Sequence, residues 1–591
     1  MLHIDFKKKD KKNELIKKMI KKSLKYHFLS IKSYAFLLKY GILMKEKYSG
    51  TGGYMSKMIL KGAAGKAVSR TVSQRLKLVD YKQLVEPFRL RNEKDNAWRC
   101  EFWGKVLRPA ITFAHFSDDP ELRRIIDNTV ADMMKYQTAD GCISSYPEEL
   151  QLQGWDIWGR KYVLKALLRY YELLNPDPAV LACCCRMVDH LMTQIGKDKI
   201  NILECGCHEG LAASSILGAI VSLYKISGDK KYREFAEYII SQGGSILGNV
   251  FEGAVLGVVP AALGNGKAYE MTSCFQGIAE LLLFEPDPEK QRFLEKYYKA
   301  VLEREIFVTG TGGARDRWGE YWYEGALRQT MPDNLGLGET CITATWMRYC
   351  ARMLQLTDDC TIADEIEKAL YNSLIGALAS DGTHWVHVNP TPLTGNGCKR
   401  CADDQIGRGF GTPFGGNDCC RAQGPEGLAV ACEIAVMKSG NKTTVNLFEA
   451  LESENLKISG NYPYEPLAEI TYNAPEDSVL RLRTPEFLKS VKVNGSEVPF
   501  ICGKYLELTH KGMTTDSIVL EFDFSLKEIA APGNTGYTAV KRGPLVLAED
   551  SRSNVPDAVV TESWRGKTLC EYAAAGNEMN ENNTLTVWFK N

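Results

Sequence analysis

The chain has 591 residues, too many for a single hydrophobic core, so two or more domains are expected. Apolar residues make up 45% and charged residues 25% of it, as in an ordinary globular protein, and the formal net charge of zero excludes a global field that would attract nucleic acid or a membrane surface. The 18 cysteines are scattered, which favours buried reduced thiols over a disulfide scaffold.

Residues 1–80 are predicted to be a basic N-terminal extension with little ordered structure. Lysines recur densely from Lys7 to Lys47, and Lys39 interrupts the apolar stretch Ser33–Met44. A transmembrane helix needs about 20 predominantly apolar residues, so no membrane span is predicted. The run lacks the aromatic residues of a stacking surface, so no nucleic-acid partner is expected. No clear signal peptide is visible, and the compartment, cytoplasmic or periplasmic, stays open.

Residues 81–437 have the periodicity of paired amphipathic helices. Apolar residues recur three and four positions apart in segments such as Leu217–Ile226 and Tyr232–Ser241. Short turns that contain Asp separate successive helices, because an Asp carboxylate caps the exposed N–H groups of the following helix. A long series of antiparallel helical hairpins closes most naturally into an (α/α) toroid, with an open solenoid as the alternative.

From residue 438 the hydrophobic period changes to two, which predicts a β-rich domain over residues 438–591. Ser478–Arg483 and Ser517–Phe524 have the alternation of strands, and Asn494–Gly495 is a strong hairpin signal. This pattern indicates a β-sandwich packed against the helical body. The polar tail after Asp550 is not assigned from the sequence.

Two short stretches form a candidate metal site. Glu339 and Cys341 lie at the start of a predicted helix, and Cys419 and Cys420 are adjacent in a glycine-rich loop. Three thiolates and one carboxylate make a workable tetrahedral set for Zn²⁺. The alternative is that these cysteines are buried structural thiols.

Two carboxylates are candidates for acid–base work, since paired carboxylates are the usual equipment for cleaving glycosidic bonds. Glu320 lies in the aromatic stretch Trp318–Trp322, and Glu324 follows it closely. Aromatic neighbours would desolvate such an acid, raise its pKa and stack on a sugar ring. The alternative is a surface acid in a connecting loop.

Several short motifs occur in the order and approximate spacing of one known family. They are Cys207–Glu209, Gly338–Cys341, Glu365–Asn372, Asp381–Gly382 with Asn389–Pro390, Cys419–Cys420 and Lys541–Val546. On these motifs the chain resembles, over residues 81–550, the β-L-arabinofuranosidases of glycoside hydrolase family 127. The combination of Glu-x-Cys with Cys-Cys is specific, whereas the surrounding helical sequence is not.

The resemblance implies an (α/α)6 barrel with a C-terminal β-sandwich, the second sandwich of the family being missing or much reduced. It also implies a retaining, exo-acting glycosidase. Zn²⁺ would be held by Glu339, Cys341, Cys419 and Cys420. Cys419 would be the nucleophile, as a thiolate, and Glu320 the acid/base, with Glu324 as its rival.

The resemblance further implies a set of substrate-binding residues, some of which depart from the family pattern. The set is Tyr162, His208, Lys267, Glu367, His387 and Arg421. Lys267 and Tyr162 stand where the family has histidines, His387 where it has a tyrosine, and Arg421 where proline is common. We therefore hypothesise that Lys267, with Arg421, reads an acidic furanose of a plant cell-wall oligosaccharide, such as aceric acid of rhamnogalacturonan II.

Two other classes of function stay open at this point. One is a non-catalytic glycan-binding protein in which zinc has only a structural role and holds the loops together. Helical toroids also host polysaccharide lyases and sugar epimerases, which the fold alone does not separate from hydrolases. The oligomeric state is not predicted.

Overall fold

The computed structural model describes residues 57–94, 98–313, 319–331, 337–393, 395–396, 419–577 and 583–591. The predicted lysine-rich extension lies, up to residue 56, outside the described residues. Its last part differs from the prediction, because it contains strand β1 (Met58–Leu60), helix α2 (Ala63–Thr71) and the π-helical turn Val72–Leu76. Leu60 and Ala64 are buried in the main core, so the ordered chain begins well before the predicted boundary at residue 81.

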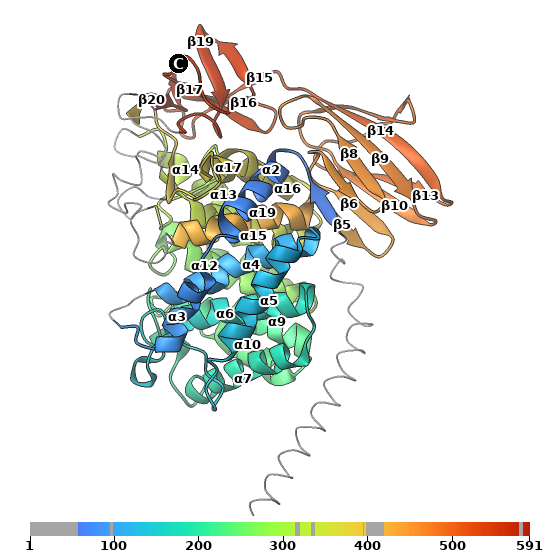
Figure 1. Cartoon of the computed structure of the whole chain (residues 1–591). Helices are drawn as coiled ribbons and strands as arrows, with labels where there is room; N and C mark the ends of the chain where they lie inside the picture. Colours follow the sequence, from blue (N-terminus) through green and yellow to red (C-terminus); the bar gives the residue numbers. More distant parts are fainter. Residues whose placement is uncertain are drawn as a thin grey trace, which may run out of the picture.

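Six helices of the described chain, all labelled in Figure 1, form an inner ring, because each packs against the next and the last packs against the first. They are α4 (Phe102–Phe116), α6 (Asp156–Leu173), α9 (Leu217–Ser227), α12 (Ala268–Leu282), α15 (Thr340–Thr357) and α19 (Cys419–Ala435). Almost every residue of α4, α12, α15 and α19 is buried, as expected for helices surrounded on all sides. The closed ring confirms the predicted barrel and decides against an open solenoid.

An outer helix packs against each inner one. In chain order the outer helices are α2, α5 (Pro120–Met134), α7 (Pro178–Gln194), α10 (Lys230–Ser241), α13 (Pro288–Arg304) and α16 (Thr361–Ala369). The predicted Asp turns begin four of them, since the side chains of Asp119, Asp177, Asp229 and Asp287 accept backbone N–H groups of the first helical turn. Within the described residues, no helix is both long and apolar enough to cross a membrane.

The interior of the ring contains a buried ion-pair network between inner helices. The Glu426 carboxylate of α19 accepts from Arg348 Nη2 of α15 at 2.6 Å and pairs with Arg108 of α4. Arg169 of α6 pairs with Glu426 at 3.3 Å and with Glu433 at 2.5 Å. The network therefore ties together four helices that are distant in sequence.

The β-rich region begins with a sandwich, as predicted. One sheet has seven strands in the order β1, β7 (Leu451–Ser453), β8 (Leu456–Ser459), β9 (Leu467–Ala474), β14 (Thr514–Phe522), β11 (Leu488–Val493) and β12 (Ser496–Glu497). The other has four, in the order β13 (Tyr505–His510), β10 (Ser478–Arg483), β6 (Lys442–Val445) and β5 (Val436–Ser439). Burial alternates residue by residue along β9, and Asn494–Gly495, both with positive φ, joins β11 to β12.

A second β unit follows the sandwich, although the sequence indicated that a second sandwich is missing or much reduced. Its strands up to Asp550 lie within the predicted sandwich, and the later ones lie in the unassigned tail. Its eight-stranded sheet runs β15, β16, β17, β19, β18, with β20, β21 and β4 attached. Their bounds are Leu526–Ala530, Tyr537–Arg542, Leu545–Asp550, Lys567–Glu571, Thr561–Trp564, Thr584–Thr586, Phe589–Lys590 and Gly395–Asn396, in the same order. It has a separate core that includes Val546, Tyr572 and Trp588, so residues 438–591 hold two β units rather than one sandwich and a tail.

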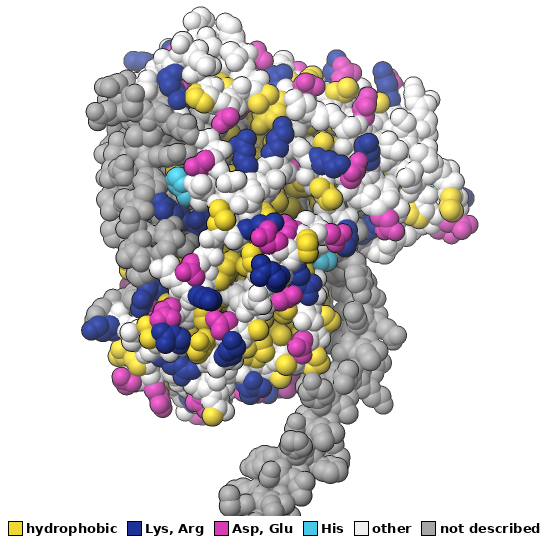
Figure 2. Space-filling model, viewed as in Figure 1, with side chains coloured by type: hydrophobic (Ala, Val, Ile, Leu, Met, Phe, Trp, Pro, Cys, Tyr) yellow, Lys and Arg dark blue, Asp and Glu magenta, His cyan; other side chains and the backbone are white. Residues whose placement is uncertain are grey.

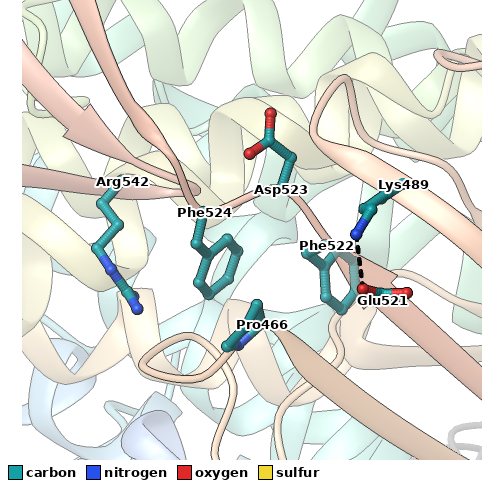
Figure 3. Close-up of a pocket in the computed structure, with 7 residues that line it drawn as sticks. All are labelled: Pro466, Lys489, Glu521, Phe522, Asp523, Phe524 and Arg542. Carbon is teal, nitrogen blue, oxygen red and sulfur yellow. Dashed lines mark hydrogen bonds and ion pairs between the residues drawn. The ribbon is translucent and has the colours of Figure 1, made fainter.

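A cavity of about 600 Å³ opens on the β-rich region (Figure 3). Phe522, Phe524 and Pro466 form its apolar part, and charged side chains surround them. The lining acid Glu521 is paired with Lys489 at 2.8 Å. On the face shown in Figure 2, basic and acidic side chains are interspersed, in keeping with the net charge of zero. None of the predicted catalytic or metal-binding residues lines this cavity.

Candidate active site

The four residues predicted to bind metal meet where two neighbouring inner helices begin. Strand β2 (Leu337–Glu339) leads directly into α15, so Glu339 and Cys341 stand at the N-terminus of α15. Cys419 and Cys420 are the first residues of α19, which packs against α15. The Cys420 Sγ lies 3.3 Å from the Cys341 Sγ and 3.4 Å from the Glu339 Oε1. The Cys419 Sγ lies 3.9 Å from the Cys420 Sγ and 4.0 Å from the Glu339 Oε1.

His387 joins this cluster, although the sequence assigned it to the substrate. It directly precedes strand β3 (Val388–Pro390), which pairs with β2, and its Nδ1 lies 3.8 Å from the Cys419 Sγ. Donor atoms of Glu339, His387, Cys419 and Cys420 all lie within 4.8 Å of one another. With the Cys341 thiol, the cluster therefore offers five possible ligands.

The cluster fits a metal ion on two grounds. Ligand atoms about 2.3 Å from one tetrahedral zinc lie roughly 3.7 Å apart, close to the sulfur and oxygen spacings observed here. In addition, the Glu339 Oε2 is buried and accepts no hydrogen bond from the described residues. A buried carboxylate oxygen without a donor is costly, and a cation would satisfy it. Thiolate and imidazole groups are ligands that suit Zn²⁺.

The protonation of the cluster distinguishes Cys419 from the other cysteines. Contacts with the thiols of Cys341 and Cys420, together with the nearby His387 ring, hold the pKa of Cys419 well below its usual range although burial opposes this. Burial raises the pKa of Cys341 and of Cys420. Burial and the charge of Cys419 raise the pKa of Glu339 to about 8. Because thiolate is the nucleophilic form, this pattern favours Cys419 as the reactive sulfur.

Of the two candidate acids, Glu320 lies beside the cluster. Its Oε1 is 3.9 Å from the His387 Nε2, on the ring edge opposite the nitrogen that approaches Cys419. The backbone carbonyl of Glu320 accepts from the Ala268 N–H at 3.1 Å, which ties this loop to the start of α12. Glu324 instead accepts from the Arg304 Nε at 3.1 Å and is partly exposed. The geometry therefore favours Glu320 over Glu324.

Lys267 is buried at the N-terminus of α12 and is paired with Glu320. Its Nζ lies 2.6 Å from the Glu320 Oε2 and 4.0 Å from the Glu270 Oε1. Burial opposes the charge of Lys267, but Glu270 and Glu320 raise its pKa above the usual value. This cation is therefore held by carboxylates of the protein.

Aromatic side chains pack against the thiols. The ring of Trp158 lies 5.2 Å from that of Tyr162 and 5.2 Å from that of Tyr269, and the hydroxyls of the two tyrosines contact each other. These rings form one buried cluster with Cys341 and Cys420. The ring of His208 lies 5.3 Å from that of Trp155, which packs against this cluster. The structure thus brings Tyr162 and His208 to the site.

Comparison with known proteins assigns the family. The family model described as the β-L-arabinofuranosidase GH127 catalytic domain matches residues 64–432, more than half of the chain. The chain belongs to glycoside hydrolase family 127. It is therefore a glycoside hydrolase, and this membership decides against the lyase and epimerase alternatives.

Several known arabinofuranosidases are similar to this chain at low sequence identity. A non-reducing end β-L-arabinofuranosidase of Bifidobacterium longum subsp. longum is 23% identical over 508 residues, which cover 77% of this chain and 75% of that protein. The structure of a GH127 β-L-arabinofuranosidase from Geobacillus stearothermophilus T6 is 18% identical, with a TM-score of 0.72 over 90% of this chain and 99% of that one. A second GH127 β-arabinofuranosidase structure, also 18% identical, has a TM-score of 0.73 over 92% of this chain and 98% of that one. The two structures show a shared fold.

Two further residues predicted to bind substrate, Glu367 and Arg421, lie in helices of the barrel. The Glu367 Oε1 accepts from the Tyr462 hydroxyl and from the Arg483 Nη2, both at 2.7 Å. Because Arg483 belongs to β10, this buried carboxylate joins α16 to the sandwich. Its contact with a sugar stays a prediction. Arg421 is buried in the first turn of α19, directly after Cys420.

Three charged residues of the site were not found from the sequence. The Glu101 Oε2 accepts from the Trp158 indole N–H and from the Lys105 Nζ, the latter at 3.1 Å. Glu270, in the first turn of α12, is buried next to Lys267, and its Oε2 has no hydrogen-bond partner in the described part of the chain. One signal was available, since Lys105 interrupts the otherwise apolar start of the helix at Phe102–Phe116.

Proposed function

We propose that this family 127 hydrolase is a retaining, exo-acting enzyme that releases terminal β-L-arabinofuranose from plant cell-wall oligosaccharides. The observation that carries the proposal is the His387 ring, whose two nitrogens face the Cys419 thiol at 3.8 Å and the Glu320 carboxylate at 3.9 Å. A nucleophile and an acid/base thus lie on two sides of one buried side chain. The activity that names the Bifidobacterium relative supports the exo-acting mode and the sugar.

In the proposed reaction the Cys419 thiolate attacks the anomeric carbon, and the bond from that carbon to the leaving oxygen breaks. The Glu320 carboxyl donates its proton to the leaving oxygen and then, as a carboxylate, accepts a proton from the water that displaces the thiolate. Lys267 and His387 orient the two oxygens of Glu320. Zn²⁺ held by the cluster would keep the nucleophilic thiol deprotonated at neutral pH.

An acidic furanose, such as aceric acid of rhamnogalacturonan II, is the second candidate substrate. The observation that favours it is Lys267, a buried cation at the position where the family resemblance has histidine. A substrate carboxylate would have to share the Lys267 ammonium with Glu320, and for this reason we place the neutral sugar first. Incubation of the purified protein with neutral and acidic pectic oligosaccharides, followed by mass spectrometry, tests both. Release of no sugar from either group of oligosaccharides by zinc-loaded protein would contradict both candidate substrates.

The protein is expected to be purified with about one zinc ion per chain. Cys420→Ser should lower the zinc content, because the Cys420 sulfur contacts both Cys341 and Glu339. Cys432→Ser, at another buried cysteine of α19, is the matched control and should retain the metal. Elemental analysis of the variants measures this, and a zinc content that Cys420→Ser leaves unchanged would contradict the proposed ligand set.

Glu320→Gln should lower kcat/KM on an oligosaccharide by about 10²- to 10⁴-fold, since the amide cannot donate the proton that the leaving oxygen needs. The loss should be much smaller on an aryl furanoside, whose leaving group departs without a proton. Glu324→Gln is the control and should stay within a few-fold of wild type, because Glu324 faces Arg304. Equal losses in the two variants, or no dependence on the leaving group, would remove Glu320 from its proposed role.

A further inference from the structure

Glu101 is a buried carboxylate in which one oxygen accepts hydrogen bonds and the other accepts none from the described residues. It is 3% exposed and ends the short 3₁₀ turn Arg99–Glu101, directly before α4. Its Oε2 accepts from the Trp158 indole N–H and from the Lys105 Nζ. Its Oε1 is also buried and has no hydrogen-bond partner among the described residues. Because leaving a buried carboxylate oxygen without a donor is costly, this arrangement points to a donor that arrives with a ligand.

Glu101 is joined to the predicted metal-binding cysteines through Trp158. Trp158, which holds the Oε2 of Glu101, packs in one buried cluster with Cys341 and Cys420. Cys419 also packs against this cluster. Burial raises the pKa of Glu101, Lys105 opposes that effect, and the charge of Cys419 adds to it. The Lys105 Nζ lies 4.8 Å from the centre of the Tyr269 ring, which belongs to the same cluster.

We propose that the Glu101 Oε1 accepts a hydrogen bond from a hydroxyl of the furanose ring, and that Lys105 and Trp158 hold the carboxylate in place for it. This inference rests on the proposed furanosidase function and deepens it. A carboxylate accepts from a hydroxyl but repels another carboxylate, so Glu101 selects a sugar that is neutral and carries a hydroxyl at that position. It is a specificity-determining residue of the site.

Glu101→Gln is a sharp test because the neighbours fix the orientation of the new amide. Two donors, the Trp158 N–H and the Lys105 ammonium, face the Oε2 position and keep the amide oxygen there. The NH₂ group must then occupy the Oε1 position, so the variant replaces one acceptor by a donor and leaves the shape unchanged. The zinc content of the variant should match wild type, because the change leaves the predicted metal ligands in place. The melting temperature should fall, because the amide leaves the buried Lys105 ammonium without its counter-charge.

The measurement compares wild type and Glu101→Gln on arabinofuranosides in which each sugar hydroxyl in turn is replaced by fluorine. At one position wild type should lose about 10- to 100-fold in kcat/KM, the value of a hydrogen bond to a charged group. Glu101→Gln should lose a similar factor on the intact sugar and little more on that fluoro analogue. Fluorine also changes the intrinsic reactivity of the sugar, but this effect is the same for both enzymes. It therefore cancels in the ratio of their kcat/KM values on one analogue.

Glu528→Gln is the matched control, because Glu528 also accepts from an indole N–H, that of Trp564, and from a guanidinium, that of Arg565, each at 2.9 Å. It lies on β15 in the second β unit and should leave every rate unchanged. Replacing a hydroxyl by fluorine could lower kcat/KM by the same factor in wild type and in Glu101→Gln at every position. That result would overturn the inference while leaving the furanosidase function intact. If Glu101→Gln does not fold, wild type alone decides, since a penalty of only a few-fold at every hydroxyl excludes such an acceptor. A wild type that cleaves no furanoside would overturn both proposals.

Discussion

Replacing Cys419 by serine is expected to lower the rate of sugar release by about 10⁴-fold or more. The structure gives Cys419 the properties of a nucleophile, since its thiol contacts those of Cys341 and Cys420 and its pKa lies well below the usual range. A serine hydroxyl at this position would remain protonated and would be a much weaker nucleophile. Initial rates on an aryl arabinofuranoside, with the zinc content measured on the same samples, test this expectation.

The zinc measurement separates loss of the nucleophile from loss of the metal. Glu339, Cys341, His387 and Cys420 remain in Cys419→Ser, so substantial metal binding should persist while activity is lost. Cys432→Ser is the control for removing a buried thiol from the same helix and should keep both metal and activity. Near-normal activity of Cys419→Ser would show that another group attacks the anomeric carbon.

Local patterns in the sequence predicted the elements of the fold, but not how the ring closes. Each Asp turn that caps α5, α7, α10 or α13 can be recognised from a few consecutive residues, and all four turns begin a helix. Closure of the ring depends on the packing of α19 against α4, which are some three hundred residues apart in the sequence. Hydrophobic periodicity reports local structure and does not predict such a contact. The second β unit was missed for a similar reason, because its strands after Asp550 are short and polar and acquire their core only by pairing with β16 and β17.

In the candidate site, too, the sequence predicted contacts between neighbouring residues but not contacts between distant segments. Glu339 with Cys341, and Cys419 with Cys420, are pairs of neighbours in sequence, and the spacing within each pair was enough to predict a shared ligand set. Glu367 also lies in a family motif, yet its partners Tyr462 and Arg483 come from the β-sandwich, which no local pattern reveals.

The partners of Lys267 could not be predicted from the sequence. The sequence identified a cation at the start of α12, and the structure buries it. Its partner at 2.6 Å is Glu320, which lies fifty-three positions away in the sequence. The ammonium is therefore already paired with a carboxylate of the protein when no substrate is bound. The choice between a neutral and an acidic sugar therefore depends on three-dimensional pairing and not on the residue type alone.

Glu426→Gln is expected to lower the free energy of unfolding by about 3–5 kcal/mol, the usual effect of removing one partner from a buried ion-pair network. Glu426 is fully buried inside the inner ring, where Arg108, Arg169 and Arg348 converge on it from three other helices. The amide would leave these guanidinium charges only partly compensated, because Glu433 is the remaining carboxylate that pairs with two of them. Urea unfolding followed by circular dichroism measures the change.

The same network predicts how stability depends on pH. Burial opposes ionisation of Glu426, but the charges of Arg108, Arg348 and Arg169 hold its pKa well below the usual range. Since the folded-state pKa is the lower one, the contribution of this carboxylate is fully present above the unfolded value of about 4.3 and is lost as the pH falls below it. The difference between wild type and Glu426→Gln should therefore be greatest near neutral pH and should shrink in acid. Glu86→Gln, which removes an exposed pair with Arg89, is the control and should change stability at neither pH. A loss of stability in Glu426→Gln that is the same at neutral and acidic pH would show that packing of the side chain, rather than its charge, holds the ring together.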